Sequence, residues 1–425
     1  MHVVGLLAAL TWMLGLGLLA SRVSRSTGIP DLVFFVLIGL VIGPQVLHVI
    51  QLPANRDLGQ IIVTGGAIFM LYEGGRAVDI HMLRRIWLGT GLLATLGVVL
   101  TASVVAVAAH YLVNLSWPVA ALGGAAVAST DPATIVPLFA QVRVRARVQQ
   151  LVISESAFND ATGAVATMTV LAVIGGHSLG AVAIGTTFIQ MVLVGLAVGL
   201  GIGFLVQVLD AEGSRLALFT MEEENAVATL FAMLAAYILA ETLGGSGFMA
   251  VFIAGIIRGN ASAWGLGVHP AREQSHTTFL SLLGTAVRIL IFGALGANVD
   301  LNLLGKLGFG GLLVVAVLLF VARPLTVFTC LVLDRASRWT AREMLFTSWV
   351  RETGVVPAAL ASIMLAEGAP GASQVAALIF LAVLATILLQ GPTTAFWARK
   401  TGVAHKRSAP ERPAVGAQSS PGDGL

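Results

Sequence analysis

The chain has 425 residues and a formal net charge of +3, and its composition is strongly apolar. Hydrophobic residues make up 57% of it and charged residues only 11%, whereas soluble domains carry about 25% charged residues. The mean hydropathy is +0.92. These values exclude a soluble globular enzyme and predict an all-α polytopic membrane protein. The single cysteine, Cys330, excludes an intramolecular disulfide.

Apolar stretches recur along the whole chain, and a bilayer core of about 30 Å requires about 20 such residues per helix. We predict about thirteen transmembrane helices, some of them short or broken. They cover residues 3–20, 30–48, 57–79, 86–110, 117–141, 148–175, 181–209, 222–243, 246–257, 276–297, 303–333, 343–366 and 373–396. Together they form one transmembrane domain, residues 1–397. Residues 398–425, rich in Pro, Gly, Ser and charge, predict a short disordered cytoplasmic tail.

Basic residues in the loops predict the orientation of the spans. Counted on alternate sides, eighteen Lys and Arg lie on one side, and only Arg56 and Lys306 lie on the other. Because cytoplasmic loops carry the excess of Lys and Arg, the N-terminus is expected outside the cell and the C-terminus in the cytoplasm. The expected location is the cell (inner) membrane. The isoelectric point of about 9.4 fits loops that face anionic lipid better than a nucleic-acid partner.

Two spans carry helix-breaking and charged residues in mid-membrane. The fifth reads GGAAVASTDPATIVPLF, with Asp131 and Pro132 at its middle, and the twelfth reads LFTSWVRETGVVPAALASIML, with Arg351, Glu352 and Pro357. Proline removes a backbone donor, so both helices are expected to unwind there. The two spans are an odd number apart and therefore run in opposite directions. This pattern predicts two inverted repeats whose broken helices cross at the membrane midplane, as in secondary transporters.

The sixth span contains ISESAFNDATG, with two carboxylates in an otherwise apolar helix. Each ionised group near the bilayer centre costs roughly 2.5 to 3.5 kcal/mol, so both carboxylates are expected to have a function. At 100° per residue, Ser156 and Asp160 share one stripe of the helix, and Glu155 and Asn159 form the next. The two stripes make one polar face.

Residues of the broken fifth span can complete this face. Thr130 and Asp131 would add oxygen ligands to those of the sixth span, and oxygen ligands suit a hard monovalent cation such as Na+ or K+. The predicted ion-binding residues are Thr130, Asp131, Ser156, Asn159 and Asp160.

Two deep arginines, Arg323 in FVARPLTVF and Arg351 in WVRETGVV, balance some of the acidic charge. A buried carboxylate that is paired with arginine stays ionised and structural, whereas an unpaired one binds a proton. We therefore expect one carboxylate to be held by arginine and another to stay available. The available carboxylate could exchange protons for cations, because either ion neutralises it.

The fifth and sixth spans thus carry two motifs, ASTDPATIVPLF and ISESAFNDATG. With IPDLVFFVLIGLVIGP, MLYEGGRAVDI and AAYILAETLGGSGFMAVFIAGIIRGN elsewhere in the chain, they resemble the monovalent cation:proton antiporters of the NhaP and sodium/proton exchanger type. The resemblance implies thirteen helices in two inverted repeats, a homodimer and alternating access. It also implies exchange of Na+ or K+ for H+ without a cofactor.

The resemblance assigns roles to individual residues. The family's essential carboxylate corresponds to Asp160, with Asn159 beside it, and Arg323 corresponds to the arginine that pairs with Glu155. Arg351 corresponds to the arginine of a segment that usually reads Gly-Leu-Arg-Gly. Positions that line or order the ion site correspond to Thr130, Asp131, Glu155 and Ser156.

Two details of the resemblance concern charge. Relatives with a second aspartate at the position of Asn159 are electrogenic, so this chain is expected to exchange ions one for one without net charge movement. The segment around Arg351 reads VRETG, and its Glu352 departs from the family pattern. Glu352 and Arg351 are therefore predicted to lie next to the site, with a bearing on ion selectivity.

Parts of this pattern also occur in two other classes of protein. Asp131 and Asp160 could form the dyad of an intramembrane aspartyl protease, but no span contains its Gly-x-Gly-Asp element, and the only Gly-Asp-Gly lies at 422–424 in the tail. A cation channel is the second alternative. Channels usually gain selectivity from rings of subunits or carbonyls, whereas broken inverted repeats favour alternating access.

Overall fold

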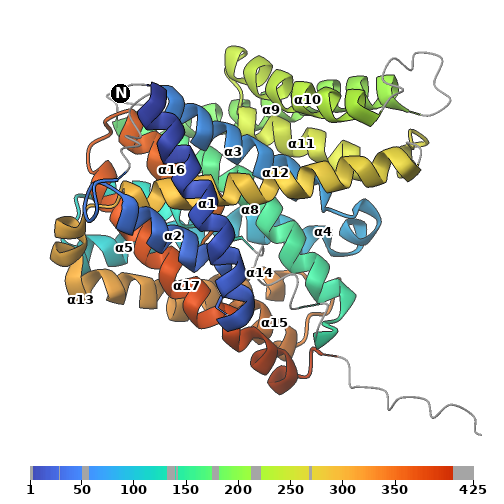
Figure 1. Cartoon of the computed structure of the whole chain (residues 1–425). Coiled ribbons are helices and arrows are strands. Elements are labelled where there is room, and N and C mark those ends of the chain that lie inside the picture. The colour runs from blue at the N-terminus through green and yellow to red at the C-terminus, as the bar shows by residue number, and fades with distance from the viewer. Residues whose placement is uncertain are drawn as a thin grey trace, which may run out of the picture.

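The computed structural model describes residues 3–27, 29–49, 57–131, 139, 142–174, 181–211, 222–267 and 270–404. Within these residues the chain is helical and has no strand beyond an isolated bridge between Val144 and Ala404 (Figure 1). The α-helices are α1 (Val3–Thr27), α2 (Asp31–Ile42), α3 (Asp57–Arg76), α4 (Ile80–Ala94), α5 (Leu96–Val113), α6 (Trp117–Ala126), α8 (Ala146–Ile174), α9 (Ala181–Asp210), α10 (Glu222–Thr242), α11 (Gly247–Gly259), α12 (Pro270–Ala297), α13 (Leu301–Val317), α14 (Arg323–Leu333), α15 (Ala341–Trp349), α16 (Val355–Ala366) and α17 (Ala372–Thr401). A 3-10 helix, η1, covers Ala261–Trp264, and a π-helix, η2, covers Leu318–Ala322.

The predicted all-α membrane fold is confirmed, and each predicted span overlaps at least one helix. Among the described residues, seven segments are long and apolar enough to cross a membrane, and four shorter apolar helices accompany them. The number of thirteen crossings stays a prediction.

Several predicted spans differ in detail from the observed helices. The span at 86–110 is two helices, α4 and α5, which are separated at Thr95. The span at 303–333 contains the π-helix η2 between α13 and α14. The last span continues as α17 to Thr401, where Gly402 ends it in the left-handed conformation that glycine adopts readily. Helix α17 thus extends beyond the predicted domain end at 397, and residues 405–425 of the predicted tail lie outside the described residues.

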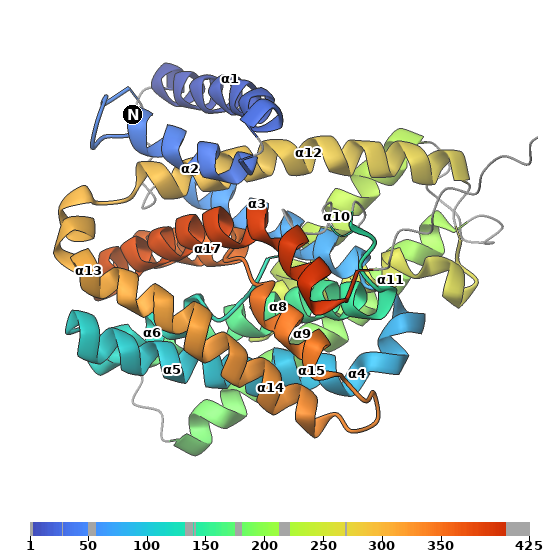
Figure 2. The same ribbon diagram turned by 90° about the horizontal axis from the view of Figure 1, so that it is seen from below.

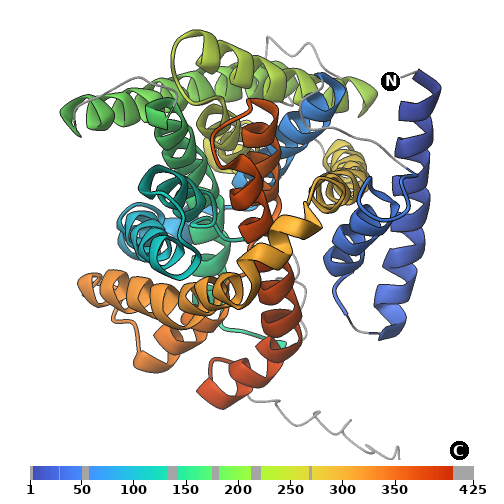
Figure 3. The ribbon, with the colours of Figure 1, turned by 90° about the vertical axis from the view of Figure 1, so that its left-hand side faces the viewer.

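The helices pack in groups that are far apart in the sequence. Helix α12 packs against α2, α3 and α16, and Figure 2 shows it running alongside α1 and α2. Helices α9, α10 and α11 pack together, and α4 and α6 both pack on α8. The N-terminal pair α1 and α2 lies along one edge of the molecule (Figure 3). Small residues permit the closest contacts, since any side chain at Gly39 of α2 would overlap the backbone of Gly293 in α12.

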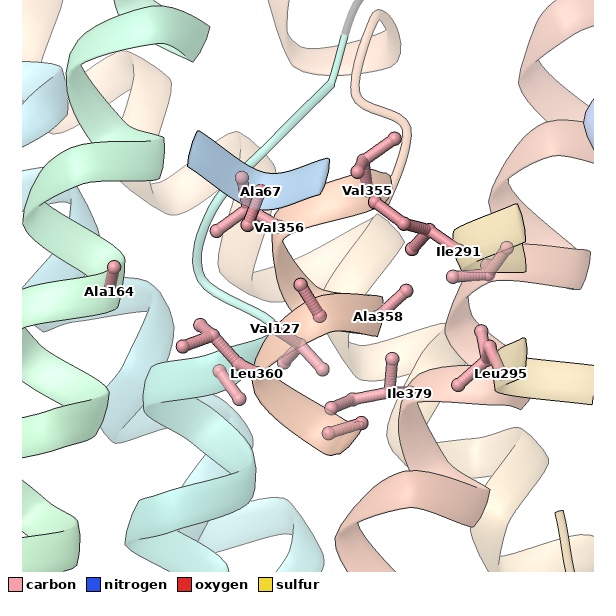
Figure 4. Packing of buried hydrophobic residues seen from close by; sticks show 14 of the residues in the cluster. Ala67, Val127, Ala164, Ile291, Leu295, Val355, Val356, Ala358, Leu360 and Ile379 are labelled. Atoms are coloured by element: carbon pink, nitrogen blue, oxygen red, sulfur yellow. The ribbon is translucent and has the colours of Figure 1, made fainter. Parts of the chain in front are cut away.

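The short helix α16 contributes many buried residues to the largest apolar core in the described part of the chain. Figure 4 shows its side chains surrounded by residues from other helices. The residues labelled there are Val355, Val356, Ala358 and Leu360 of α16, Val127 at the end of α6, Ala67 of α3, Ala164 of α8, Ile291 and Leu295 of α12, and Ile379 of α17. The neighbouring helices therefore fix the position of α16, including its N-terminus.

Candidate ion site at the crossing of two interrupted helices

Two helices end inside the protein and continue as extended backbone. Helix α6 ends at Ala126, and residues 129–131 that follow are non-helical; helix α15 ends at Trp349, and residues 350–354 lead without helical structure to α16. The two extended segments cross where the backbone N–H of Asp131 donates to the carbonyl of Glu352 at 2.9 Å. The N–H of Thr353 donates to the hydroxyl of Thr386 in α17 at 3.0 Å. These bonds replace part of the helical hydrogen bonding that both segments lose. Pro132, which we expected to cause the break in the fifth span, lies outside the described residues.

Arg351 lies at the C-terminal end of α6. Its guanidinium donates to the carbonyls of Val127 and Ser129, the latter at 3.3 Å, and to the Thr353 hydroxyl at 3.1 Å. Arg351 is 1% exposed. Because the C-terminus of a helix carries partial negative charge, the buried arginine and the end of α6 stabilise each other.

Asp131 balances the opposite partial charge at the start of α16. Its Oδ2 accepts a hydrogen bond from the N–H of Val355, the first residue of α16, at 3.2 Å. A carboxylate is favourable at a helix N-terminus, where partial positive charge accumulates. Arg351 and Asp131 are therefore each placed at the helix end of opposite sign.

Gly354 leaves the space for this arrangement, and Gly354→Ala should disrupt it. A Cβ at Gly354 would overlap the Cβ, Cγ and Oδ2 of Asp131, so Asp131 or the extended backbone must move. Overpacking of this kind typically costs about 1 to 3 kcal/mol. We expect a lower melting temperature in detergent and strongly reduced ion exchange. Gly65→Ala in α3 is the matched control, because a Cβ there meets no other atom. Equal melting temperatures and equal exchange rates in the two variants would contradict this description of the crossing.

Two residues of α8 bind the extended backbone that follows α6. The Asn159 side chain accepts from the N–H of Thr130 at 3.0 Å and donates to the Thr130 hydroxyl at 2.8 Å. The Ser156 hydroxyl donates to the carbonyl of Thr130. Ser156, Asn159 and Thr130 are all buried. The polar face predicted from helical spacing thus faces the interrupted helix, with Asn159 and Ser156 engaged in holding Thr130.

Glu155 forms an ion pair with Arg323, the first residue of α14. Arg323 donates to both oxygens of Glu155, to Oε2 at 2.8 Å, and it also donates to the carbonyl of Thr347 at 3.2 Å. Both side chains are almost fully buried. A bidentate pair of this kind is a strong, charge-assisted contact, and it joins α8 to α14. Asn159 donates a further, longer bond of 3.4 Å to Glu155.

Asp160 lies halfway along α8 and is partly exposed. Its Oδ1 is buried, and no group in the described part of the chain forms a hydrogen bond with that atom. Asp131 is close enough to interact with the Asp160 carboxyl group electrostatically, and the Ser129 hydroxyl is within its reach. Asp160 thus combines an ionisable carboxyl group, partial access and an oxygen with spare capacity, which is the chemistry required to bind either a proton or a cation.

Glu352 is buried at the crossing, and its side chain faces α17. Its Oε1 lies 3.4 Å from the position that a Cβ on Gly391 would occupy, and the same position is 3.2 Å from the ring of Pro30. Glu352, which was predicted to lie next to the site, therefore contacts the crossing through its backbone carbonyl, which accepts a hydrogen bond from the N–H of Asp131.

All of the predicted site residues lie at or next to the crossing. The sequence interpretation missed Thr353 and Thr386, which bond the extended segment to α17. Thr386 lies within a long apolar run, LIFLAVLATILL, and a single threonine there is typical of many membrane helices. The bond between Thr353 and Thr386 depends on which residue of α17 faces the unwound backbone, and the local sequence does not indicate which residue that is.

Comparison with known proteins provides independent evidence for the family of this chain. A family model described as "Sodium/hydrogen exchanger, transmembrane" matches residues 9–400. The K(+)/H(+) antiporter NhaP of Alkalimonas amylolytica is 29% identical over 390 residues, which are 88% of this chain and 63% of that protein. The Na(+)/H(+) antiporter 1 of Methanocaldococcus jannaschii is 32% identical over 357 residues, 81% of this chain and 80% of the relative. This chain therefore spans less than two thirds of the bacterial relative's length and four fifths of the archaeal one.

The fold is also similar to a solved structure. The structure of the sodium proton antiporter MjNhaP1 from Methanocaldococcus jannaschii at pH 8 superposes with a TM-score of 0.81 at 28% sequence identity. The match covers 95% of this chain and 99% of that one. The similarity thus extends over nearly the whole of both chains.

Proposed function

Since the chain belongs to the sodium/hydrogen exchanger family, we propose that it is a secondary active antiporter that exchanges a monovalent cation, Na+ or K+, for H+ by alternating access. The observation that carries this proposal is Asp160, a partly exposed carboxylate with a buried oxygen that is free of hydrogen bonds among the described residues, beside two crossed helix interruptions. The proposal needs no cofactor. The ions are its substrates.

In this mechanism a cation and a proton compete for Asp160. A cation bound there would find further oxygen ligands in Thr130, Asp131, Ser156 and Asn159, which lie on the crossing and on the same face of α8. Glu155 and Arg323 would hold α8 and α14 in register as the site changes its access. In this proposal the site changes its access only when a cation or a proton neutralises Asp160, so each reorientation would carry one ion. Reorientation of the empty site would be unfavourable, because it would move an uncompensated charge through the membrane.

The surroundings of the protein belong to the same proposal. The loop charges support a multi-pass protein of the inner membrane with its N-terminus outside and its C-terminus in the cytoplasm. The family resemblance supports a homodimer. The partners are then the lipid bilayer, a second copy of the chain and the exchanged ions, with no nucleic acid.

The proposal is tested by ion uptake into proteoliposomes. An outward-directed proton gradient should drive accumulation of radioactive sodium or rubidium, and ammonium chloride, whose free ammonia enters the vesicles and neutralises the acidic interior, should abolish it. A channel would give unitary currents in planar bilayers, and a protease would cleave a membrane substrate. Either of those activities without proton-driven uptake would contradict the antiporter.

The exchange should be electroneutral, one cation for one proton. Glu155 is paired with Arg323 and Asp131 with the N-terminus of α16, which leaves Asp160 as the exchanging carboxylate, and its helical neighbour Asn159 is neutral. One exchangeable negative charge carries either ion, so no net charge moves in a full cycle. The sodium-driven rate in proteoliposomes should therefore not respond to a potential set with valinomycin and potassium. A steep dependence on that potential would show that a second group, such as Glu352, also carries charge.

A further inference from the structure

The fourth predicted span contains a break that lies next to the ion-site helix. Helix α4 ends at Ala94 and α5 begins at Leu96, with Thr95 between them at φ −117° and ψ −79°. Neither proline nor glycine occupies the break. At an interruption of this kind, carbonyl groups of the first helix lose their intrahelical partners and need other donors, especially in a membrane.

A threonine of α8 supplies a donor at this point. The Thr162 hydroxyl donates to the carbonyl of Ala94 at 2.6 Å. The same oxygen lies 3.1 Å from the carbonyl of Phe158 and 3.4 Å from the carbonyl of Asn159, both within its own helix. A hydroxyl has one hydrogen to donate, and the shortest distance favours the bond between helices. Thr162 is 8% exposed and Ala94 is 2% exposed, so little water competes for this bond.

The bond reaches the turn of α8 that carries the ion site. Thr162 follows Asp160 by two residues, and Asn159, which holds both the N–H and the hydroxyl of Thr130, is one turn before Thr162. On the other side of the break, α5 is bonded to α14 through Thr101 and Thr326 at 3.0 Å. The break in α4 and α5 thus lies between two helices that are themselves joined by Glu155 and Arg323.

We propose that Thr162 is a positioning residue of the ion site. Its bond to Ala94 fixes the turn of α8 from Phe158 to Thr162 against the α4/α5 break, and so sets where Asp160 and Asn159 meet the extended segment at Thr130. This inference rests on the proposed cation:proton exchange at Asp160. The side chain touches no ion itself. It acts through the placement of the ligands, and therefore bears on cation affinity and on discrimination between cations of different radius.

The test is Thr162→Val, which keeps the β-branched shape and removes the hydroxyl. We expect the KM for Na+ or K+ to rise roughly three- to tenfold, in line with the usual value of one hydrogen bond, with a smaller change in maximal rate. The ratio of KM values for Li+, Na+ and K+ should also change. Thr162→Ser, which keeps the donor, should restore both quantities to within about twofold. If the valine variant does not fold, Thr162→Ala provides the same measurement without a β-branch.

Thr167→Val is the matched control. Thr167 is also a buried threonine of α8, but its hydroxyl donates within the helix, to Gly163 at 2.7 Å. The control should leave KM and the cation ratio unchanged. The inference is overturned if Thr162→Val keeps the wild-type KM and cation ratio, if Thr167→Val changes them equally, or if serine does not restore them. Wild-type protein without any cation-driven proton flux would instead contradict the proposed exchange itself, so the two failures are distinguishable.

Discussion

Asp160→Asn should leave the protein folded and reduce cation-driven proton flux to the level of protein-free liposomes. The amide is nearly isosteric with the carboxyl group, and Asp160 contributes no ion pair to the described structure. An amide binds no proton in this pH range and brings no negative charge to a cation. Both half-reactions of the exchange are therefore lost together. The measurement is the change in internal pH of proteoliposomes after addition of NaCl or KCl.

Asp300→Asn is the control for this experiment. Asp300 caps the start of α13, where its carboxylate accepts from the N–H of Asn302 at 2.8 Å. Asparagine is an equally good N-cap, so this variant should transport like the wild type. Substantial cation-driven proton flux through Asp160→Asn would show that another group is the carrier.

Glu155→Ala and Arg323→Ala should each destabilise the protein strongly. Removing one partner of a buried ion pair leaves an uncompensated charge, which typically costs about 3 to 5 kcal/mol of the free energy of unfolding. Arg323 also donates to the carbonyl of Thr347, so the loss of the Arg323 side chain removes a contact to α15 as well as the pair with α8. Thermal unfolding in detergent, followed by loss of the monodisperse peak, measures the effect.

A double variant separates pairing from packing. Glu155→Leu with Arg323→Met replaces both charges by apolar groups of similar size, and such replacements of buried pairs are often neutral or stabilising. We expect it to recover part of the stability that each alanine variant loses. Single variants that unfold at the wild-type temperature would show that the pair does not stabilise the bundle.

Much of this architecture could be predicted from the sequence, because membrane spans and charged residues give strong local signals. Apolar runs located the helices, and Asp131 and Arg351 in mid-membrane located the crossing. Helical spacing placed Ser156 and Asp160 on one face of α8. The pairing of Arg323 with Glu155 came from family resemblance, since no local pattern connects residues so far apart in the chain.

The remaining features depend on contacts between helices and have no local signal. The break at Thr95 has no proline or glycine, and the carbonyl of Ala94 finds its donor in Thr162 of another helix. The structural role of Arg351 was also not evident from the sequence, because its guanidinium donates to backbone carbonyls at the end of another helix, α6. Glu352 stood out in the sequence as a departure from the family, but only the packed structure places its side chain toward α17.

The most direct test of the proposed exchange is proton flux in proteoliposomes when Li+, Na+ and K+ are added in turn. Vesicles with an acidic interior and a trapped pH indicator would contain wild-type protein or none. Addition of at least one of these cations should raise the internal pH at a saturable rate, and choline at the same concentration should not. An internal pH that responds to none of the alkali cations, with correctly folded protein in the vesicles, would contradict cation:proton antiport by this chain.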